Sequence, residues 1–125
     1  EKKALKINPN INIHKSKYVP TNLKEFNLNN NYLVFSGIGN HKTFISMLKE
    51  CGFQIIKDLE FSDHYNYLDK ELDKIINLAE KLNCKIITTE KDYYRFNKKY
   101  YQNIKCIKSE LKLDDEEKLV KFLYN

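Results

Sequence analysis

A continuous apolar run at residues 32–35, followed at once by the glycine turn of residues 36–40 (Ser-Gly-Ile-Gly-Asn), constrains the fold of this chain most strongly. An unbroken apolar run is typical of a strand that is buried on both faces, as in the parallel sheets of α/β proteins. After the turn, apolar residues recur at helical spacing until Gly52, a residue suited to end a helix. We therefore predict a strand, a tight turn, and a helix over about 41–51 with Asn40 as its N-cap.

The rest of the chain repeats this alternation of strand and helix. The further predicted elements are a strand over 53–61, a helix over 68–83 that ends at Asn83, strands over 84–87 and 105–107, and a helix from 114. Alternating strands and helices favour a parallel sheet with helices on both faces. The sequence thus predicts an α/β fold, a three-layer α/β/α sandwich around a mostly parallel sheet of about four strands.

The first thirty residues differ in character from the rest. Residues 1–30 contain Pro9, Pro20 and much of an asparagine-rich run, with only short β-prone pieces. We expect them to form an inter-domain linker or a short β-hairpin, and residues 31–125 to form the α/β domain. The chain begins with Glu rather than Met, so we expect it to be cut from a longer protein; it has no secretory segment or apolar membrane span, which predicts a soluble, unprocessed piece.

Charge and cysteine content narrow the function only slightly. The net charge of +5 and the isoelectric point near 9.0 suit a nucleic acid or an anionic membrane surface. The abundance of lysine, asparagine and isoleucine, with very little arginine, indicates that part of this charge is a bias of composition. The cysteines are three, an odd number without a Cys-x-x-Cys spacing, so we interpret Cys51, Cys84 and Cys106 as small buried apolar residues in a reducing cytoplasm.

Polar residues follow each of the first three predicted strands. They lie at 37–40, at 63–64 and at 88–92. Parallel strands joined by right-handed crossovers all end at one edge of the sheet. We therefore expect the three loops to meet at that edge, where one site can hold them all.

The glycine turn has two interpretations. Free backbone N–H groups at Gly37, Gly39 and Asn40 can cradle an anion at the start of a helix. Alternatively, the glycines only permit a positive φ and a close approach of strand and helix. The turn is not a dinucleotide fingerprint, because Lys42 stands where that pattern requires glycine, and the chain contains no Walker A sequence.

His64 is the strongest single candidate for chemistry. An imidazole at a strand end can act as a general base when a carboxylate partner orients it. It can equally be a loop residue that packs locally. The neighbouring Asp63 is expected to be a loop or cap residue, because adjacent side chains on extended backbone point apart.

The third loop and the segment after it also allow two interpretations each. Thr88 or Thr89 can cap the next helix in a Thr89-x-x-Asp92 box; alternatively, Thr89, Glu90, Lys91 and Asp92 face a ligand. Residues 91–101 interleave aromatic and basic side chains, as in a surface that stacks on bases or binds headgroups, but the rings can also cover the sheet edge with their hydroxyls in water. Two further histidines, at 14 and 41, have no supporting neighbours and are expected to be solvated.

Taken in order, these segments resemble a known family. Phe35–Asn40, Phe61–His64 with Tyr67, and Thr88–Asp92 with Arg95 are similar to the C-terminal domain of the tetraacyldisaccharide 4'-kinase family, whose pattern runs approximately F-A-G-I-G-N-P, F-P-D-H and T-T-E-K-D. The resemblance spans about residues 30–108. The sequence departs from the pattern at His41 and Ser62, where the family usually has proline, and at Leu68, where it usually has a small hydroxylated residue.

The resemblance implies a function for the whole enzyme rather than for this chain. It implies transfer of the γ-phosphoryl group of ATP, with Mg²⁺, to the 4'-hydroxyl of a lipid A precursor disaccharide at the cytoplasmic face of the inner membrane. His64 then matches a catalytic histidine that pairs with an aspartate of the N-terminal P-loop domain of the same polypeptide. The P-loop and the metal ligands also belong to that domain, so we expect this chain to bind no metal and to be inactive alone.

One other class of function is consistent with the residues. The chain can be a stand-alone, non-catalytic module that binds anionic lipid headgroups through residues 91–101. Nucleic-acid binding through the same residues has no motif to support it, and we expect no nucleic acid as a partner.

Overall fold

The structure, a computed structural model, describes residues 16–113. The predicted helix from residue 114 and His14 lie outside the described residues. Contacts between residues divide the chain into two units, one of residues 1–21 with 109–125 and one of residues 22–108.

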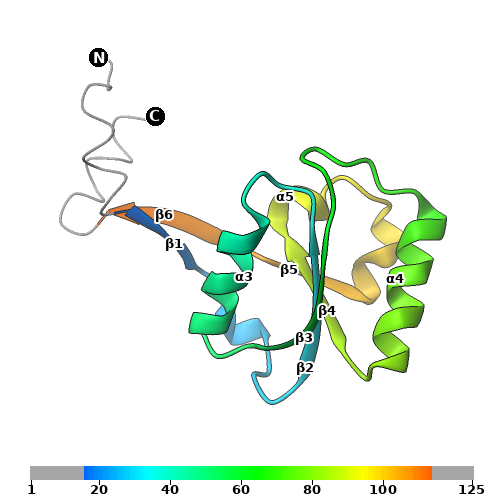
Figure 1. Cartoon of the computed structure of the whole chain (residues 1–125), viewed down its shortest axis with the longest axis horizontal. Coiled ribbons are helices and arrows are strands. Elements are labelled where there is room, and N and C mark those ends of the chain that lie inside the picture. The colour runs from blue at the N-terminus through cyan, green and yellow to red at the C-terminus, as the bar shows by residue number, and fades with distance from the viewer. Residues whose placement is uncertain (1–15, 114–125) are drawn as a thin grey trace. The chain divides into compact units, whose positions relative to one another are not determined.

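The larger unit is a parallel sheet with a helix on each face (Figure 1). The sheet has the order β3-β2-β4-β5, and each neighbouring pair of strands is parallel. Its strands are β2 (Asn31–Ser36), β3 (Gln54–Glu60), β4 (Lys85–Thr89) and β5 (Ile104–Ile107). The helical elements are α3 (His41–Glu50), α4 (Asp69–Lys81), the short α5 (Glu90–Tyr93), and the 3-10 turns η1 (Leu23–Glu25) and η2 (Lys98–Gln102). The predicted α/β/α sandwich with four parallel strands is confirmed.

The apolar run of β2 lies between two hydrophobic cores. Leu33 and Phe35 point into the core that α4 covers, whereas Tyr32 and Val34 point into the core that α3 covers. Side chains alternate between the two faces of a strand, so a strand with helices on both faces needs apolar residues at every position. This arrangement explains why the sequence of β2 shows no alternation of apolar and polar residues.

The helices end where the sequence predicts, but one cap differs. Gly52 follows α3 with φ of 101°, and Asn83 follows α4 with φ of 57°, both in the left-handed region that ends helices. Asn40 occupies the N-cap position of α3, yet its side chain makes no capping hydrogen bond. The backbone of Asn40 is not in the extended conformation usual for a capping residue (φ −124°, ψ 54°), so the predicted side-chain cap is wrong.

The described residues of the other unit include a two-stranded antiparallel ribbon. β1 (Ser16–Pro20) pairs with β6 (Ser109–Leu113), with Ser16 opposite Leu113 and Pro20 opposite Ser109. The β-prone residues near Tyr18 therefore do form a strand, but its partner comes from the other end of the chain rather than from a local hairpin. Strand β6 was not predicted, because a five-residue segment with a serine, a glutamate and a lysine beside Leu111 and Leu113 gives only a weak strand signal.

Most aromatic residues of the 91–101 segment pack onto the domain, whereas Tyr94 is largely exposed. The rings of Tyr93 and Tyr101 stack with centroids 3.9 Å apart, and Phe96 and Tyr100 are buried. The hydroxyl of Tyr100 donates to the Asp73 carboxylate (3.0 Å), and that of Tyr101 donates to the Tyr93 carbonyl (3.1 Å). The edge-covering interpretation is confirmed, although these two hydroxyls bind protein groups rather than water alone.

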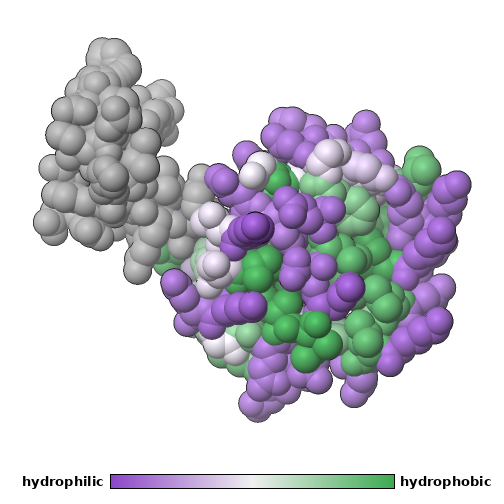
Figure 2. Space-filling view, viewed as in Figure 1, coloured by the Kyte–Doolittle hydropathy of each residue, from purple (hydrophilic) through white to green (hydrophobic). Residues whose placement is uncertain are grey.

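The exposed surface of the described residues is mainly polar. Figure 2 shows hydrophilic side chains over much of the face that it presents, with apolar patches between them. The large apolar side chains that are exposed are Leu28, Ile56, Leu68 and Tyr94. Within the described residues, no helix is both long and apolar enough to cross a membrane.

A candidate site at the carboxyl ends of the parallel strands

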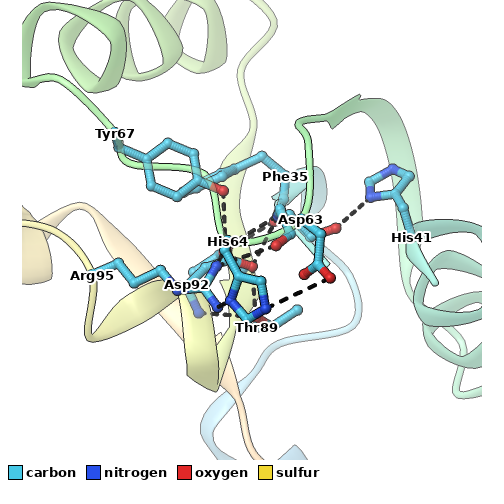
Figure 3. Close-up of polar contacts among 11 residues, drawn as sticks. Phe35, His41, Asp63, His64, Tyr67, Thr89, Asp92 and Arg95 are labelled. Atoms are coloured by element: carbon cyan, nitrogen blue, oxygen red, sulfur yellow. Dashed lines mark hydrogen bonds and ion pairs between the residues drawn. The ribbon is translucent and has the colours of Figure 1, made fainter. Parts of the chain in front are cut away.

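The three polar loops meet at one edge of the sheet, as predicted (Figure 3). The His64 N–H donates to the Gly37 carbonyl (3.0 Å), which joins the second loop to the first. The Gly37 N–H donates to both carboxylate oxygens of Asp92 (3.1 Å each), which joins the first loop to the third. One backbone–backbone hydrogen bond and one backbone–carboxylate contact, between segments 27 and 55 residues apart, thus fix the loops to one another.

Asp92 is the centre of these contacts and is fully buried. Besides the Gly37 N–H, its carboxylate accepts from the Tyr67 hydroxyl (3.0 Å), the Thr89 hydroxyl (2.6 Å) and Nη1 of Arg95 (3.3 Å). A buried charge is costly unless it is paired and hydrogen-bonded. Here one guanidinium and several donors from three loops satisfy the carboxylate, so the charge of Asp92 holds the loops together.

Thr89 explains why α5 begins at residue 90. Its hydroxyl oxygen accepts from the Asp92 N–H (3.1 Å), which is the N-cap contact predicted from the Thr89-x-x-Asp92 spacing. The second half of a capping box, a bond from the Asp92 side chain to the Thr89 N–H, is replaced by the bond to Gly37. The cap prediction is therefore confirmed, and the carboxylate that we considered for a ligand faces the protein interior.

Position 37 requires glycine because its surroundings leave no room for a side chain. A Cβ atom at this position would lie 2.8 Å from the Ser62 carbonyl oxygen and 3.1 Å from the Tyr67 hydroxyl. The described glycines with positive φ include Gly52 but neither Gly37 nor Gly39, so the expectation of positive φ in this turn is wrong. The N–H of Gly37 is already bonded to a carboxylate, an arrangement that favours the packing interpretation of the turn over an anion cradle.

His64 is presented at the surface of this arrangement. Its side chain is 78% exposed, and its backbone adopts the left-handed region with φ of 61°. Nη2 of Arg95 lies 3.2 Å from its Nδ1. The imidazole is therefore anchored on one side and open on the other.

Asp63 lies closer to His64 than its sequence position suggested. Its Oδ2 is 3.7 Å from Nε2 of His64. The prediction that these side chains point apart assumed extended backbone, whereas the Tyr65 N–H donates to the Ser62 carbonyl (3.1 Å) and turns the chain here. Because both side chains are largely exposed, the contact contributes little to stability.

His41 is buried rather than solvated, so that prediction is wrong. Its Nδ1 lies 2.6 Å from Oγ of Ser36, and its Nε2 lies 2.8 Å from Oδ1 of Asp58. Although the three residues form a serine–histidine–aspartate series, Ser36 is fully buried and no substrate can reach its hydroxyl. The series instead links β2, the start of α3 and β3, next to the glycine turn.

The side-chain chemistry of Tyr67 and Arg95 did not lead us to predict that these two residues contact the site. Burial above all, and then the charge of Asp92, raises the pKa of Tyr67 far above its ordinary value, so its hydroxyl stays a donor. Arg95 stands three residues after Asp92, one helical turn away, which was the only available signal of their contact.

The remaining predicted residues lie at the rim of the site. Gly39, Asn40 and Lys91 are exposed, and Glu90 is half-buried. Burial raises the pKa of the Cys84 and Cys106 thiols, which keeps them protonated and poor metal ligands. The described residues contain no group of histidine, cysteine and acidic side chains that could hold a metal ion.

A second hydrogen-bonded carboxylate supports the start of α4. Glu71 accepts from the Tyr65 hydroxyl and from the Leu68 N–H (2.9 Å). The bond from Tyr65, followed by the bond from Leu68, lowers the pKa of Glu71 below its ordinary 4.5. Leu68 has no hydroxyl that could accept a hydrogen bond and complete a reciprocal cap. The Glu71 carboxylate therefore provides the side-chain hydrogen bond at the start of this helix.

The lowered pKa of Glu71 predicts a dependence of stability on pH. A carboxyl whose pKa falls on folding stabilises the protein above its ordinary pKa, and this contribution is lost as the pH falls through the lowered pKa. In urea unfolding, Glu71→Gln should therefore be less stable than wild type at neutral pH, and the difference should vanish well below the lowered pKa. Glu80→Gln, at an exposed position of the same helix, is the control. A difference that stays constant with pH would contradict this prediction.

Fold and site together define a class of protein. The chain contains a parallel α/β domain whose strand-end loops are fixed by a buried aspartate and present one exposed histidine, an arrangement typical of an enzyme domain. The sequence profile of the family described as tetraacyldisaccharide-1-P 4'-kinase matches residues 2–125. The chain therefore belongs to the tetraacyldisaccharide 4'-kinase family.

Individual relatives agree with this assignment. The chain is 54% identical over 114 residues to a tetraacyldisaccharide 4'-kinase of Pelagibacter ubique, covering 91% of this chain and 36% of the relative. It is 39% identical over 104 residues to that of Rickettsia akari, covering 83% of this chain and 31% of the relative. The crystal structure of LpxK from Aquifex aeolicus in complex with ATP is similar with a TM-score of 0.52 and 25% identity, covering 87% of this chain and 34% of that one. The chain thus spans about a third of the length of these relatives.

Proposed function

We propose that this chain is the C-terminal part of a lipid kinase that uses ATP to phosphorylate the 4'-hydroxyl of tetraacyldisaccharide 1-phosphate in lipid A biosynthesis. The family assignment and the names of the relatives support this reaction. The role that we propose for this C-terminal part rests on a difference in exposure between residues at the strand ends. Asp92 and Thr89 are buried and fix the loops, while the imidazole of His64 is open to a partner.

In this proposal His64 supplies one half of the group that activates the acceptor hydroxyl. A carboxylate from the N-terminal P-loop domain of the same polypeptide supplies the other half. This carboxylate accepts the proton of the 4'-hydroxyl as the hydroxyl oxygen attacks phosphorus, and the imidazole N–H of His64 donates to the carboxylate and orients it. Of the two aspartates in this site, Asp92 is buried and bonded to other donors, and Asp63 is exposed with its Oδ2 3.7 Å from Nε2 of His64. The exposed side of the imidazole is thus left for the incoming domain.

The residues of this chain do not fit ATP and Mg²⁺ by themselves. The sequence has no P-loop, the Gly37 N–H is bonded to Asp92, and the described residues contain no group suited to hold a metal ion. Phosphoryl transfer depends on positioning and on neutralising the phosphate charge. We therefore assign the binding of ATP and Mg²⁺ to the N-terminal domain.

The proposed place of action is the cytoplasmic face of the bacterial inner membrane, where the lipid precursor is the substrate. The net charge of +5 supports contact with an anionic surface. A stand-alone headgroup-binding module is the alternative, but the rings at 93, 96, 100 and 101 that would have formed its binding surface pack against the domain.

The proposal predicts that these residues are necessary but not sufficient for activity. Full-length protein should transfer phosphate from ATP to tetraacyldisaccharide 1-phosphate, whereas this chain alone should show no transfer above the blank in a radiolabel assay. Full-length protein without this chain should also be inactive. Transfer by this chain alone would contradict the division of roles, and an inactive full-length protein would contradict the proposed reaction.

A further inference from the structure

Arg95 bridges the buried centre of the site and the exposed imidazole. Its Nη1 donates to the Gly37 carbonyl (3.2 Å) and to Asp92 Oδ1 (3.3 Å), and its Nη2 lies 3.2 Å from Nδ1 of His64 (Figure 3). The side chain of Arg95 is only 20% exposed. One guanidinium therefore contacts all three loops, and its orientation is fixed by groups other than His64.

The chemistry of the two side chains sets the direction of their hydrogen bond. A guanidinium only donates and does not lose its proton in proteins, so Nδ1 of His64 must accept. A neutral imidazole that accepts at one nitrogen carries its proton on the other. The contact thus places the proton of neutral His64 on Nε2, the nitrogen on the side of Asp63.

The backbone of His64 is held at the same point. Its N–H donates to the Gly37 carbonyl oxygen, which also accepts from Arg95. Because the carbonyl of Gly37 locates both the guanidinium and the main chain of His64, the ring has few orientations that keep the Nδ1 contact. Asp92 in turn holds Arg95 through a pair of opposite charges, one of them fully buried.

We propose that Arg95 is a positioning residue that fixes the tautomer and orientation of His64, and that Asp92 anchors it. This inference rests on the proposed function of His64. Neither residue needs to touch substrate, because Arg95 acts through the imidazole and Asp92 acts through the guanidinium.

The first test measures the tautomer directly. Full-length protein labelled with ¹⁵N-histidine is compared with Arg95→Lys, which keeps a positive charge beside Asp92 but lacks the fork that reaches Nδ1 and the Gly37 carbonyl together. In wild type, long-range ¹H–¹⁵N spectra should show an unprotonated, hydrogen-bonded Nδ1 and a protonated Nε2 for His64. In Arg95→Lys, both nitrogens should shift toward the values of a free imidazole. Identical His64 shifts in the two proteins would overturn the inference.

The second test asks whether Arg95 acts through His64. The kcat of full-length wild type, Arg95→Lys, His64→Asn and the double variant is measured with saturating ATP and tetraacyldisaccharide 1-phosphate, by single turnover where activity is low. When His64 is present, Arg95→Lys should lower kcat by about tenfold or more, by analogy with the 10–100-fold losses seen when the groups that orient metal-bound histidines are removed. When His64 is already asparagine, Arg95→Lys should lower kcat by less than about twofold. Lys81→Arg, at the exposed end of α4, is the control for a basic exchange.

The outcomes separate the two claims. An equal loss from Arg95→Lys in both backgrounds shows a purely structural role and overturns the inference, even if His64 is needed for activity. Full activity of His64→Asn instead overturns the proposed role of His64, and the tautomer measurement still decides whether Arg95 fixes the ring.

Discussion

Replacing Asp92 by alanine is expected to lower the free energy of unfolding of this chain by about 3–5 kcal/mol, the range for removing one partner of a buried ion pair. The substitution leaves the Gly37 N–H and the Tyr67 hydroxyl without their acceptor in the interior. It also leaves Arg95, largely buried, without its counter-charge. Urea unfolding followed by circular dichroism measures the loss, which should appear as a lower midpoint.

Two further variants make the result for Asp92 specific. Asp92→Asn keeps the shape of the side chain but removes the charge and puts an amide N–H₂ among donors, so it should also be destabilised, though by less than alanine. Glu80→Ala, at an exposed carboxylate of α4, should change stability by about 0.5 kcal/mol or less. A loss from Asp92→Ala no larger than that from Glu80→Ala would contradict the central position of Asp92.

The sequence predicts the helices and strands correctly where burial produces a regular pattern of apolar residues. The apolar run of β2, the helical spacing of α3 and α4, and the stops at Gly52 and Asn83 each have a local cause, and the structure confirms them. The ribbon of β1 and β6 was missed because it pairs residues from opposite ends of the described chain, such as Ser16 with Leu113, and local sequence patterns do not indicate pairing over such a distance. Strand β3 was predicted within one residue at each end, although it is an edge strand with mostly exposed side chains.

The location of the site could be predicted from the sequence, but the contacts between its residues could not. Parallel topology alone brings the loops of Gly37, His64 and Asp92 to one edge. Which polar residues turn inward depends on the turn at 62–65 and on the space beside Gly37. For this reason the burial of His41 and the approach of Asp63 to His64 differed from prediction, and the interior orientation of Asp92 was one of two alternatives.

The second large effect concerns activity. His64→Ala in the full-length protein is expected to lower kcat by about 10²–10⁴-fold, the usual contribution of a general acid–base group. Alanine is poorly suited to the left-handed backbone of His64, which asparagine tolerates. His64→Asn should therefore lose activity to a similar extent while keeping the stability of wild type, which separates the loss of the imidazole from backbone strain.

The most direct test of the account is the rate of phosphate transfer from ATP to tetraacyldisaccharide 1-phosphate by full-length protein carrying His64→Asn. The account predicts a loss of at least about 10²-fold with an unchanged unfolding midpoint, because the exposed imidazole is the chemical group that these residues supply. A rate within about twofold of wild type would contradict it and would remove His64 from the mechanism.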